Sequence, residues 1–408
     1  MNQEITFEPL RWEERPVEDA FQELIDQVTR MSASDLYLSS LENQVELAVR
    51  RMGMVHSLAR VPWAYGRRLM NHIKVLAQIS IDETRRPQEG RIVTSTSRGK
   101  MDLRVNTLPT LFGEDFSIRL LLRDAQLRRF ENLGLLPRQL SALIGMLNSP
   151  GGLILVTGPT SSGKTTTLYA CLEHLNNGKR KINTIEDPIE YALEGVRQSQ
   201  VNYKINVDFP ELLRSVLRQA PDVIMVGEIR DPITAQTAVR AANSGHLVLA
   251  TLHAPVAGAA VHSMLAYDVN PYFLANSLRG VVAQRLIRTL CPACREAIDL
   301  SEAPETFRDI HDLLPENTRP ALYSARGCQA CNFEEYAGRT GLFEVMVITK
   351  QVRAAVAAGM MAREIERVAI EDGMVEFYRA GMLRVATGET SIEEMMRVVP
   401  AEFLGADV

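Results

Sequence analysis

The sequence lacks a hydrophobic run long enough to cross a membrane as a helix. Its most apolar stretch, residues 247–267, is interrupted by two histidines, a proline and a glycine. A transmembrane helix needs about 20 nearly uninterrupted apolar residues. Residues 1–20 are polar and acidic, with neither the basic start nor the apolar segment of a signal peptide. We therefore expect a cytoplasmic protein that reaches any membrane through its partners.

The sequence also lacks a surplus of positive charge. It has 45 Lys and Arg against 50 Asp and Glu, which gives a formal net charge of −5. Proteins that bind DNA through its phosphates normally carry a basic surplus, and platforms for single strands combine basic with aromatic side chains. Because the sequence has neither pattern, we expect no direct binding of nucleic acid.

Internal repeats and low-complexity segments are absent from the sequence too. A chain of 408 residues is longer than one hydrophobic core usually serves, so two or three domains are expected. The first part, residues 1–123, mixes helical spacing with strand-like alternation and predicts a small α/β domain. The helical stripe is Phe21, Leu24, Ile25 and Val28, and the alternating positions include Val45, Leu47 and Val49. A charged segment, residues 124–132, follows as the predicted linker.

From residue 133 onward the pattern changes to short apolar runs separated by helical segments. The runs are Leu153–Val156, Ile182–Ile185, Val223–Val226 and Leu247–Thr251. Strands that are buried on both faces have such runs, so residues 133 to about 288 are expected to form a mostly parallel sheet between helices, within a domain that spans residues 133–408. One helix is marked by Asp231 as its N-cap, Pro232 in its first turn and Gly245 beyond its end.

Residues 158–165 match the phosphate-binding pattern G-x-x-x-x-G-K-[ST]. The glycines let backbone N–H groups curl round a β-phosphate, Lys164 neutralises the β and γ oxygens, and the Thr165 hydroxyl can bind Mg²⁺. The motif follows an apolar strand and opens a helix, which is the context it requires. The predicted ATP and Mg²⁺ site consists of Gly158, Pro159, Thr160, Ser161, Ser162, Gly163, Lys164, Thr165 and Thr166.

Two carboxylates follow other strands of the predicted sheet, Glu186 after Ile182–Ile185 and Glu228 after Val223–Val226. Ligands of open α/β sheets bind at the carboxyl ends of strands, so both would face the phosphate loop. There they could orient the attacking water, deprotonate it or help to hold the metal. For either segment alone, a solvated turn explains the pattern equally well. His253 is likewise open to two readings, a catalytic histidine or a packed one.

Four of the five cysteines form two CxxC pairs, Cys291 with Cys294 and Cys328 with Cys331. An odd total with two tight pairs favours a metal site in a reducing compartment over a disulfide framework. Four thiolates predict a closed, tetrahedral, structural Zn²⁺ site, with an iron–sulfur cluster or free cysteines as the alternatives. Cys171, inside the helix after the phosphate loop, is expected to be a small buried hydrophobic residue.

Several blocks of the sequence together resemble the secretion ATPases of type II secretion and type IV pilus systems. They are GPTSSGKTTTLYA, INTIEDPIEY, QAPDVIMVGEIRDPITAQTAVRAANSGHLVLATLHA and the paired CxxC motifs. In that family these blocks hold the Walker A, Asp box, Walker B and His box segments. The resemblance implies that Glu228 is the catalytic carboxylate, that Glu186 assists at the metal and water, and that His253 senses the γ-phosphate.

The segment DLRVNTLPTLFGEDFSIRLL, residues 102–121, resembles the arginine-bearing segment of the family's smaller, PAS-like domain. Arg104 and Arg119 match its two charge-sensing arginines. Without the resemblance, two surface arginines on strands would be the preferred interpretation. With it, both are expected to act as arginine fingers toward the γ-phosphate, a role worth several orders of magnitude in rate.

The resemblance further implies a RecA-like ATPase domain with a zinc subdomain at residues 289–345 and a helical part at 346–400. It implies a homo-hexamer, peripheral at the inner membrane, that drives pilus or pseudopilus assembly or type II secretion through a platform protein. The zinc knuckles resemble assembly and secretion ATPases, not pilus retraction ATPases. Because the chain starts close to the family's second domain, we expect a short form without the extra amino-terminal domain.

Three alternatives stay open at this point. Short members of the family also serve DNA-uptake pseudopili. A RecA-like DNA-translocating or conjugation ATPase would carry the same phosphate loop, although the acidic composition counts against it. A nucleotide-bound regulatory subunit without turnover is the third alternative, and the full set of expected catalytic residues counts against that one.

Overall fold

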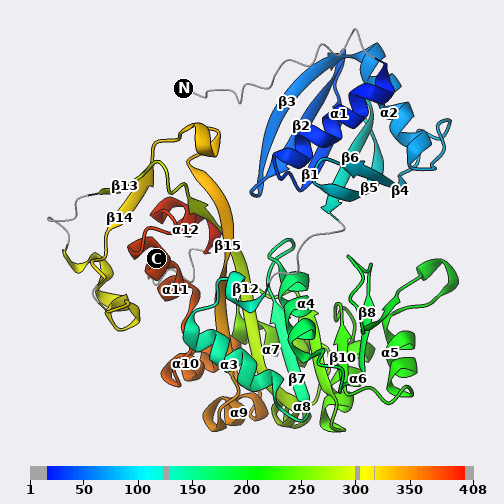
Figure 1. Cartoon of the computed structure of the whole chain (residues 1–408). Coiled ribbons are helices and arrows are strands. Elements are labelled where there is room, and N and C mark those ends of the chain that lie inside the picture. The colour runs from blue at the N-terminus through cyan, green and yellow to red at the C-terminus, as the bar shows by residue number, and fades with distance from the viewer. Residues whose placement is uncertain (1–15, 123–128, 299–303, 317, 400–408) are drawn as a thin grey trace. The chain divides into compact units, whose positions relative to one another are not determined.

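Residues 16–122, 129–298, 304–316 and 318–399 are described in the computed structural model. The chain divides into two units, residues 1–126 and 127–408 (Figure 1). Of the predicted linker, residues 124–128 lie outside the described residues, and Phe130–Asn132 form a short 3-10 helix at the start of the second unit.

The first unit is a six-stranded antiparallel sheet with two helices, α1 (Val17–Arg30) and α2 (Trp63–Leu76). The sheet order is β3-β2-β1-β6-β5-β4. Its strands are β1 (Asp35–Ser40), β2 (Gln44–Arg51), β3 (Met54–Pro62), β4 (Gln88–Thr96), β5 (Gly99–Thr110) and β6 (Gly113–Leu122).

The core of this unit follows from two periodicities in the sequence. The predicted stripe of α1 is confirmed, because Phe21, Leu24, Ile25 and Val28 are all buried against the sheet. Along β5, Leu103 and Val105 point into the same core while Arg104, on the alternate position, points to the other face. The prediction of a small α/β domain is therefore confirmed.

The second unit is built on a seven-stranded sheet in the order β15-β12-β7-β11-β10-β8-β9. Neighbours from β12 to β9 are parallel, and β15 joins β12 in the antiparallel direction. The predicted mostly parallel sheet is confirmed. The strands are β7 (Gly152–Thr157), β8 (Ile182–Glu186), β9 (Arg197–Gln200), β10 (Val223–Val226), β11 (Leu247–Leu252), β12 (Leu278–Leu290) and β15 (Tyr336–Val347).

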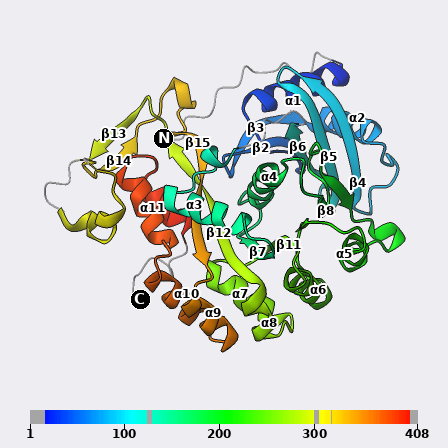
Figure 2. The ribbon, with the colours of Figure 1, turned by 60° about the horizontal axis from the view of Figure 1, so that its bottom comes forward.

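Helices cover both faces of this sheet, as Figure 2 shows for α4 and α6. Along β7, Leu153 and Leu155 pack into one hydrophobic cluster and Ile154 and Val156 into the other. Asp231 caps α6 by accepting a hydrogen bond from the Thr234 N–H, as predicted. The helices are α3 (Pro137–Leu147), α4 (Lys164–Leu175), α5 (Phe209–Leu217), α6 (Pro232–Asn243), α7 (Ala257–Ala266), α8 (Pro271–Ser277), α9 (Lys350–Ala357), α10 (Ala362–Glu371), α11 (Phe377–Ala386) and α12 (Ile392–Val398).

The cysteine-bearing segment begins directly after β12 and contains the two-stranded sheet of β13 (Arg295–Ile298) and β14 (Leu322–Ala325). The predicted limits of the zinc subdomain, 289–345, differ from the structure at the carboxyl end. Strand β15 pairs with β12 from Gly280 to Leu290, so residues 336–345 belong to the main sheet. The physical reason is the long hydrogen-bonded ladder, which a sequence pattern alone does not reveal.

One buried carboxylate connects β15 to two helices. The Oε2 atom of Glu344 accepts a hydrogen bond from the Ala257 N–H at 3.1 Å, and Oε1 accepts from the Phe377 N–H at 3.0 Å. Glu344 thereby satisfies N–H groups at the first turns of α7 and α11. Burial, aided by the charge of Glu366, raises the pKa of Glu344 to about 8.

None of the described helices combines the length and apolar character needed to cross a membrane.

The first unit contains a buried ion pair. Lys74 is fully buried in α2, where its Nζ lies 2.7 Å from Glu114 Oε2 and donates to the Glu83 carbonyl at 2.9 Å. Removing one partner of such a pair leaves an uncompensated buried charge, which costs about 3–5 kcal/mol. We predict that Lys74→Met lowers the free energy of unfolding of this unit by about that amount in urea titrations.

Lys100→Met is the matched control, because Lys100 is exposed at the start of β5. Its unfolding midpoint is expected to match that of the unsubstituted chain. Equal midpoints for the Lys74 and Lys100 variants would contradict a stabilising role for the buried pair.

Candidate active site

The parallel register brings the carboxyl ends of four strands to one edge of the sheet. Val226 of β10 lies opposite Ile185 of β8 and Ala250 of β11, and Thr157 of β7 lies opposite Leu252. Glu186 is the last residue of β8, and the phosphate loop, Glu228 and His253 each follow one of these strand ends within a few residues. The expectation that Glu186 and Glu228 lie at the same edge of the sheet as the phosphate loop therefore agrees with the strand register.

The phosphate loop connects β7 to α4, which begins at Lys164. Gly158 has φ +144°, and a Cβ there would lie 2.3 Å from the Gln284 carbonyl oxygen, so only glycine fits. On the other side of the loop, Gln284 Nε2 donates to the Ser162 carbonyl at 2.7 Å. Pro159, Thr160 and Ser161 are exposed, Gly158 and Ser162 are buried, and Gly163, Thr165 and Thr166 are half-buried.

Two observations indicate that this loop fits a phosphate group. The buried Ser162 Oγ finds no hydrogen-bond partner within the part of the chain that the structure describes. The amino terminus of α4 also opens at the loop, where its first N–H groups and the helix dipole favour an anion. A polar, electropositive cradle of this kind is what a nucleotide phosphate requires.

Lys164 folds back over its own loop. Its Nζ donates to the Gly158 carbonyl at 2.8 Å and to the Pro159 carbonyl at 3.0 Å. Burial lowers the pKa of Lys164, while the negative charge of Glu228 acts in the opposite direction. The amine therefore lies inside the loop that would surround the phosphates, within the electrostatic influence of Glu228.

Glu228 is held by two side chains from the same edge of the sheet. Its Oε1 lies 2.9 Å from His253 Nε2, and its Oε2 lies 2.6 Å from an Nη atom of Arg230. The carboxylate is mostly buried, whereas His253 and Arg230 are about half exposed. The preceding Gly227 has no room for a side chain, because a Cβ would lie 2.9 Å from the Ile185 carbonyl oxygen.

Arg230 was not among the residues that the sequence singled out. Its position two residues after Glu228 could have predicted that the two side chains lie together, because alternate residues of an extended segment point to the same side. Arg230 also reaches Asp187, with Nη1 at 3.5 Å from Oδ2. It thus contacts carboxylates that follow both β8 and β10.

Glu186 differs from the expectation that it faces the phosphate loop. It is only 3% exposed and accepts hydrogen bonds from the Tyr169 hydroxyl, from Thr184 Oγ1 and from Gln198 Nε2. These donors come from α4, β8 and β9 and enclose the carboxylate. Burial and the bond to Glu186 raise the pKa of the Tyr169 hydroxyl, which keeps it a donor.

Arg104 and Arg119 lie in one row across the first unit's sheet. They are direct neighbours in the β5–β6 register, and the row continues through Arg91 on β4 and Asp35 on β1. Residues opposite each other in register share a face, so the arginines project from the same face. Arg119 Nε lies 3.4 Å from Asp35 Oδ1. Arg91 was not predicted from the sequence, and only the strand register shows that it belongs to this row.

The four paired cysteines converge as predicted. The sulfur atoms of Cys291, Cys294, Cys328 and Cys331 all lie within 4.8 Å of one another, with Sγ–Sγ distances of 3.8 Å and 3.9 Å. A tetrahedral zinc ion with Zn–S bonds of about 2.3 Å places its sulfurs about 3.8 Å apart. The cluster therefore has the dimensions of a Zn²⁺ site.

Hydrogen bonds within the cluster shift the pKa values of two of these thiols in opposite directions. Burial acts to raise the pKa of Cys331, but hydrogen bonds from backbone N–H groups and from the thiols of Cys328 and Cys294 outweigh it and lower the pKa to about 7. Burial and the hydrogen bonds of the other thiols raise the pKa of Cys294 to about 12. The thiolate of Cys331, which is the form that binds a metal, is then accessible at neutral pH. Cys171, in contrast, is buried in α4, where burial raises its pKa to about 12, in agreement with a packing role.

Comparisons with known proteins agree with this site. The family described as "Type II/IV secretion system protein" matches residues 11–397. The chain is 39% identical to type II secretion system protein E of Pseudomonas aeruginosa, over 96% of this chain and 77% of that protein. It is 38% identical to type II secretion system ATPase E of Vibrio cholerae, over 95% of this chain and 76% of that protein.

Solved structures share the fold. The ATPase DotB of Legionella pneumophila aligns with a TM-score of 0.69 at 18% identity, over 94% of this chain and 95% of that chain. The pilus retraction motor PilT with bound ADP aligns with a TM-score of 0.62 at 24% identity, over 92% and 96%. The predicted family is confirmed by the sequence comparisons, and this chain belongs to the type II/IV secretion system protein family.

Proposed function

We propose that this protein is a hexameric motor that hydrolyses ATP at the cytoplasmic face of the inner membrane. In this proposal the motor drives pilus or pseudopilus assembly, or type II protein secretion, through a membrane platform protein. As a member of its family the chain is an ATPase. The observation that carries the proposal is the contact of Glu228 with His253 at the edge of the sheet, beside the loop of Lys164.

The chain's own residues supply the steps of hydrolysis. The backbone of residues 158–164 and the amino terminus of α4 bind the phosphates, and Lys164 neutralises their charge. Thr165 would offer its hydroxyl to Mg²⁺, which when bound neutralises charge on the β and γ oxygens. Glu228 accepts the proton of the attacking water, because each of its oxygens keeps a lone pair beyond its present hydrogen bond.

His253 is suited to report the state of the γ-phosphate to Glu228, because its Nε2 contacts the carboxylate directly. Arg104 and Arg119 are proposed as arginine fingers that stabilise charge in the transition state. Glu186 is enclosed by its hydrogen bonds, one of which comes from Tyr169 of α4, the helix that starts with Lys164. This favours a role of Glu186 in holding α4 in place over direct contact with the metal.

Removal of the proposed general base tests the chemistry. Glu228→Gln keeps the shape of the side chain but cannot accept a proton, so kcat is expected to fall about 10²–10⁴-fold while ATP binding is retained. Phosphate release and nucleotide binding are measured side by side. Glu194→Gln, at an exposed position after β8, is the matched control. Near-normal turnover in the Glu228 variant would exclude Glu228 as the base.

A chromosomal Lys164→Ala allele tests the cellular role. Loss of the phosphate-binding amine is expected to abolish the motor at normal protein level. Surface pili are counted by electron microscopy, and exported proteins and transformation frequency are measured in the same strain. Loss of pili would assign the motor to pilus assembly, and loss of export or uptake to the other machines. If all three are unchanged, the motor proposal is wrong.

The cysteine cluster is proposed to bind one structural Zn²⁺ per chain. Elemental analysis of the purified protein is expected to find zinc at about one equivalent, and Cys328→Ser is expected to lose most of it. Since metal binding contributes to folding, the Cys328 variant is also expected to melt at a lower temperature. Cys171→Ala, which leaves the cluster intact, is expected to keep its zinc. A protein that carries iron and sulfide instead would contradict this proposal.

A further inference from the structure

The side chain of Thr157 joins the strand before the phosphate loop to the residue after His253. Thr157 is the last residue of β7 and is fully buried. Its Oγ1 accepts a hydrogen bond from the Ala254 N–H at 2.8 Å and donates to the Ala254 carbonyl at 3.0 Å. The Leu252 carbonyl oxygen lies farther from the same hydroxyl, at 3.3 Å. One hydroxyl thus contacts both backbone polar groups of a residue that is 97 positions away in the sequence.

This hydroxyl extends the connection between two strands beyond the end of their ladder. β7 and β11 run parallel, and their last register pair is Thr157 with Leu252. Ala254 lies two residues past that pair. A threonine hydroxyl has one donor and two acceptor sites, so it can hold an N–H and a carbonyl group together, which a valine of the same shape cannot do. The contact uses only backbone atoms of Ala254, so it does not depend on the side chain at position 254.

The hydrogen bond from the Ala254 N–H also restrains His253, through the peptide bond that the two residues share. A peptide group is planar, and the Cα atom of the preceding residue lies in its plane. Holding the Ala254 N–H therefore holds the Cα atom of His253. From there the imidazole reaches Glu228, with Nε2 at 2.9 Å from Oε1. The His253 side chain is about half exposed, so packing alone does not hold it in place.

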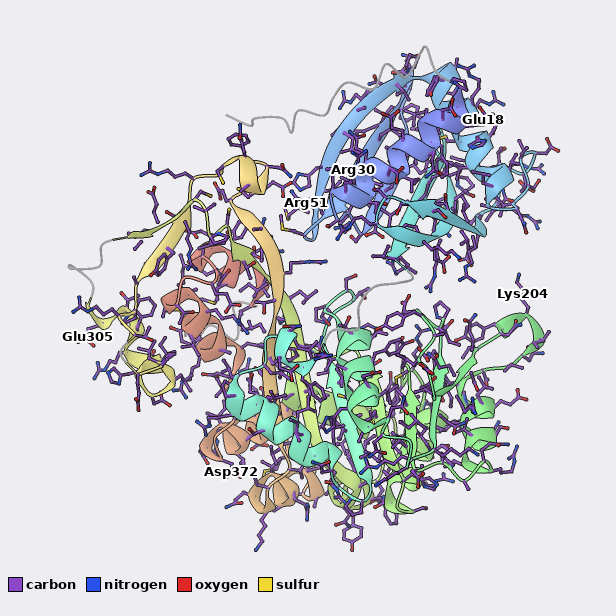
Figure 3. All side chains as sticks on the ribbon, viewed as in Figure 1. Glu18, Arg30, Arg51, Lys204, Glu305 and Asp372 are labelled. Atoms are coloured by element: carbon purple, nitrogen blue, oxygen red, sulfur yellow. The ribbon has the colours of Figure 1, made fainter. Side chains whose placement is uncertain are left out.

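Other side chains hold the segment that follows. The Pro255 carbonyl accepts a hydrogen bond from Arg285 of β12 at 3.2 Å. The Gly258 N–H, in the first turn of α7, donates to Glu366 of α10. Figure 3 labels Asp372, which directly follows α10. The segment is therefore fixed at its far end to β12 and α10, and at its near end to β7.

We propose that Thr157 is a positioning residue for ATP hydrolysis, which holds His253 where its contact with Glu228 requires it. This inference rests on the proposed roles of Glu228 and His253. It adds a connection within the site, because the strand that leads into the phosphate loop also sets the place of the histidine. A shift of β7 at its carboxyl end would then move His253 with it. The phosphates are bound by other residues, the phosphate loop and Lys164.

The first test removes the hydroxyl and keeps the shape of the side chain. In Thr157→Val, kcat is expected to fall about 10–100-fold, because misplacing a catalytic group by about 1 Å can cost about 100-fold, while the KM for ATP stays within about 3-fold. Thr157→Ser retains the hydroxyl and is expected to keep kcat within about 3-fold of the unsubstituted chain. A normal kcat in Thr157→Val, or a change confined to KM, would overturn the proposal.

Thr107→Val is the matched control, because it makes the same substitution at another fully buried threonine of a strand, β5. The Thr107 hydroxyl has no hydrogen-bond partner within the described part of the chain, so its loss is expected to leave kcat unchanged. If Thr157→Val does not fold, Thr157→Ser and Thr157→Ala make the same comparison, since both lack the methyl group and only serine keeps the hydroxyl. Equal kcat in those two variants would then refute the positioning role.

A double variant tests whether Thr157 acts through His253. Once the imidazole is absent, the placement of its backbone no longer matters to Glu228. Adding Thr157→Val to His253→Ala is therefore expected to leave kcat within about 2-fold of that of His253→Ala alone. Multiplied effects of the two substitutions would mean that Thr157 acts by another route, and the proposal would be wrong.

A second measurement does not depend on activity. Amide hydrogen exchange over residues 252–257 is expected to be faster in Thr157→Val than in the unsubstituted full-length chain and in Thr107→Val, because the Ala254 N–H loses its acceptor. Unchanged exchange there would contradict the connection. If the unsubstituted chain hydrolyses no ATP but exchange responds to Thr157, the proposed function fails and the connection stands. If it hydrolyses ATP and kcat does not respond to Thr157, only the positioning role fails.

Discussion

Burial of the parallel sheet is the constraint on which the rest of this protein depends. Every residue of β7, β8, β10 and β11 is buried, so the strands have to keep the one register that satisfies both covering layers of helices. Because the strands are parallel, that register aligns their carboxyl ends. The phosphate loop, Glu228 and His253 meet for this reason, although they come from segments far apart in the sequence. The packing of the sheet thus determines where the groups of the candidate active site lie.

Features whose signal is local could be predicted from the sequence. The apolar runs predicted the buried strands, the glycines and Lys164 predicted the loop before α4, and the cysteine spacing predicted four sulfurs at one place. In each case the deciding residues are neighbours in the chain, and physical chemistry ties the residue type to one conformation or ligand. Gly158 is an example, because its conformation and the nearby Gln284 carbonyl exclude any other residue.

Features set by contacts between distant segments could not be predicted. Glu186 ends a strand, as Glu228 follows one, yet Tyr169 from α4 and Gln198 from β9 enclose the first and leave the second at the edge. The double contact of Arg230 likewise depends on how closely β8 and β10 approach. The pairing of β15 with β12 was missed because an antiparallel ladder of that length has no local sequence signature. Side-chain networks of this kind are decided by tertiary structure, not by motif.

Strand β12 connects the phosphate loop to the cysteine cluster. Gln284, in its middle, is hydrogen-bonded to the phosphate loop, and the strand runs on to Leu290, directly before Cys291, the first cysteine of the cluster. The segment from Gln284 to Cys291 is about 23 Å long at the rise of an extended chain. It is stiffened along its length by β15. A tilt of this segment by about 5° would displace its cysteine end by about 2 Å, so β12 directly links the position of the phosphate loop to that of the cysteine cluster.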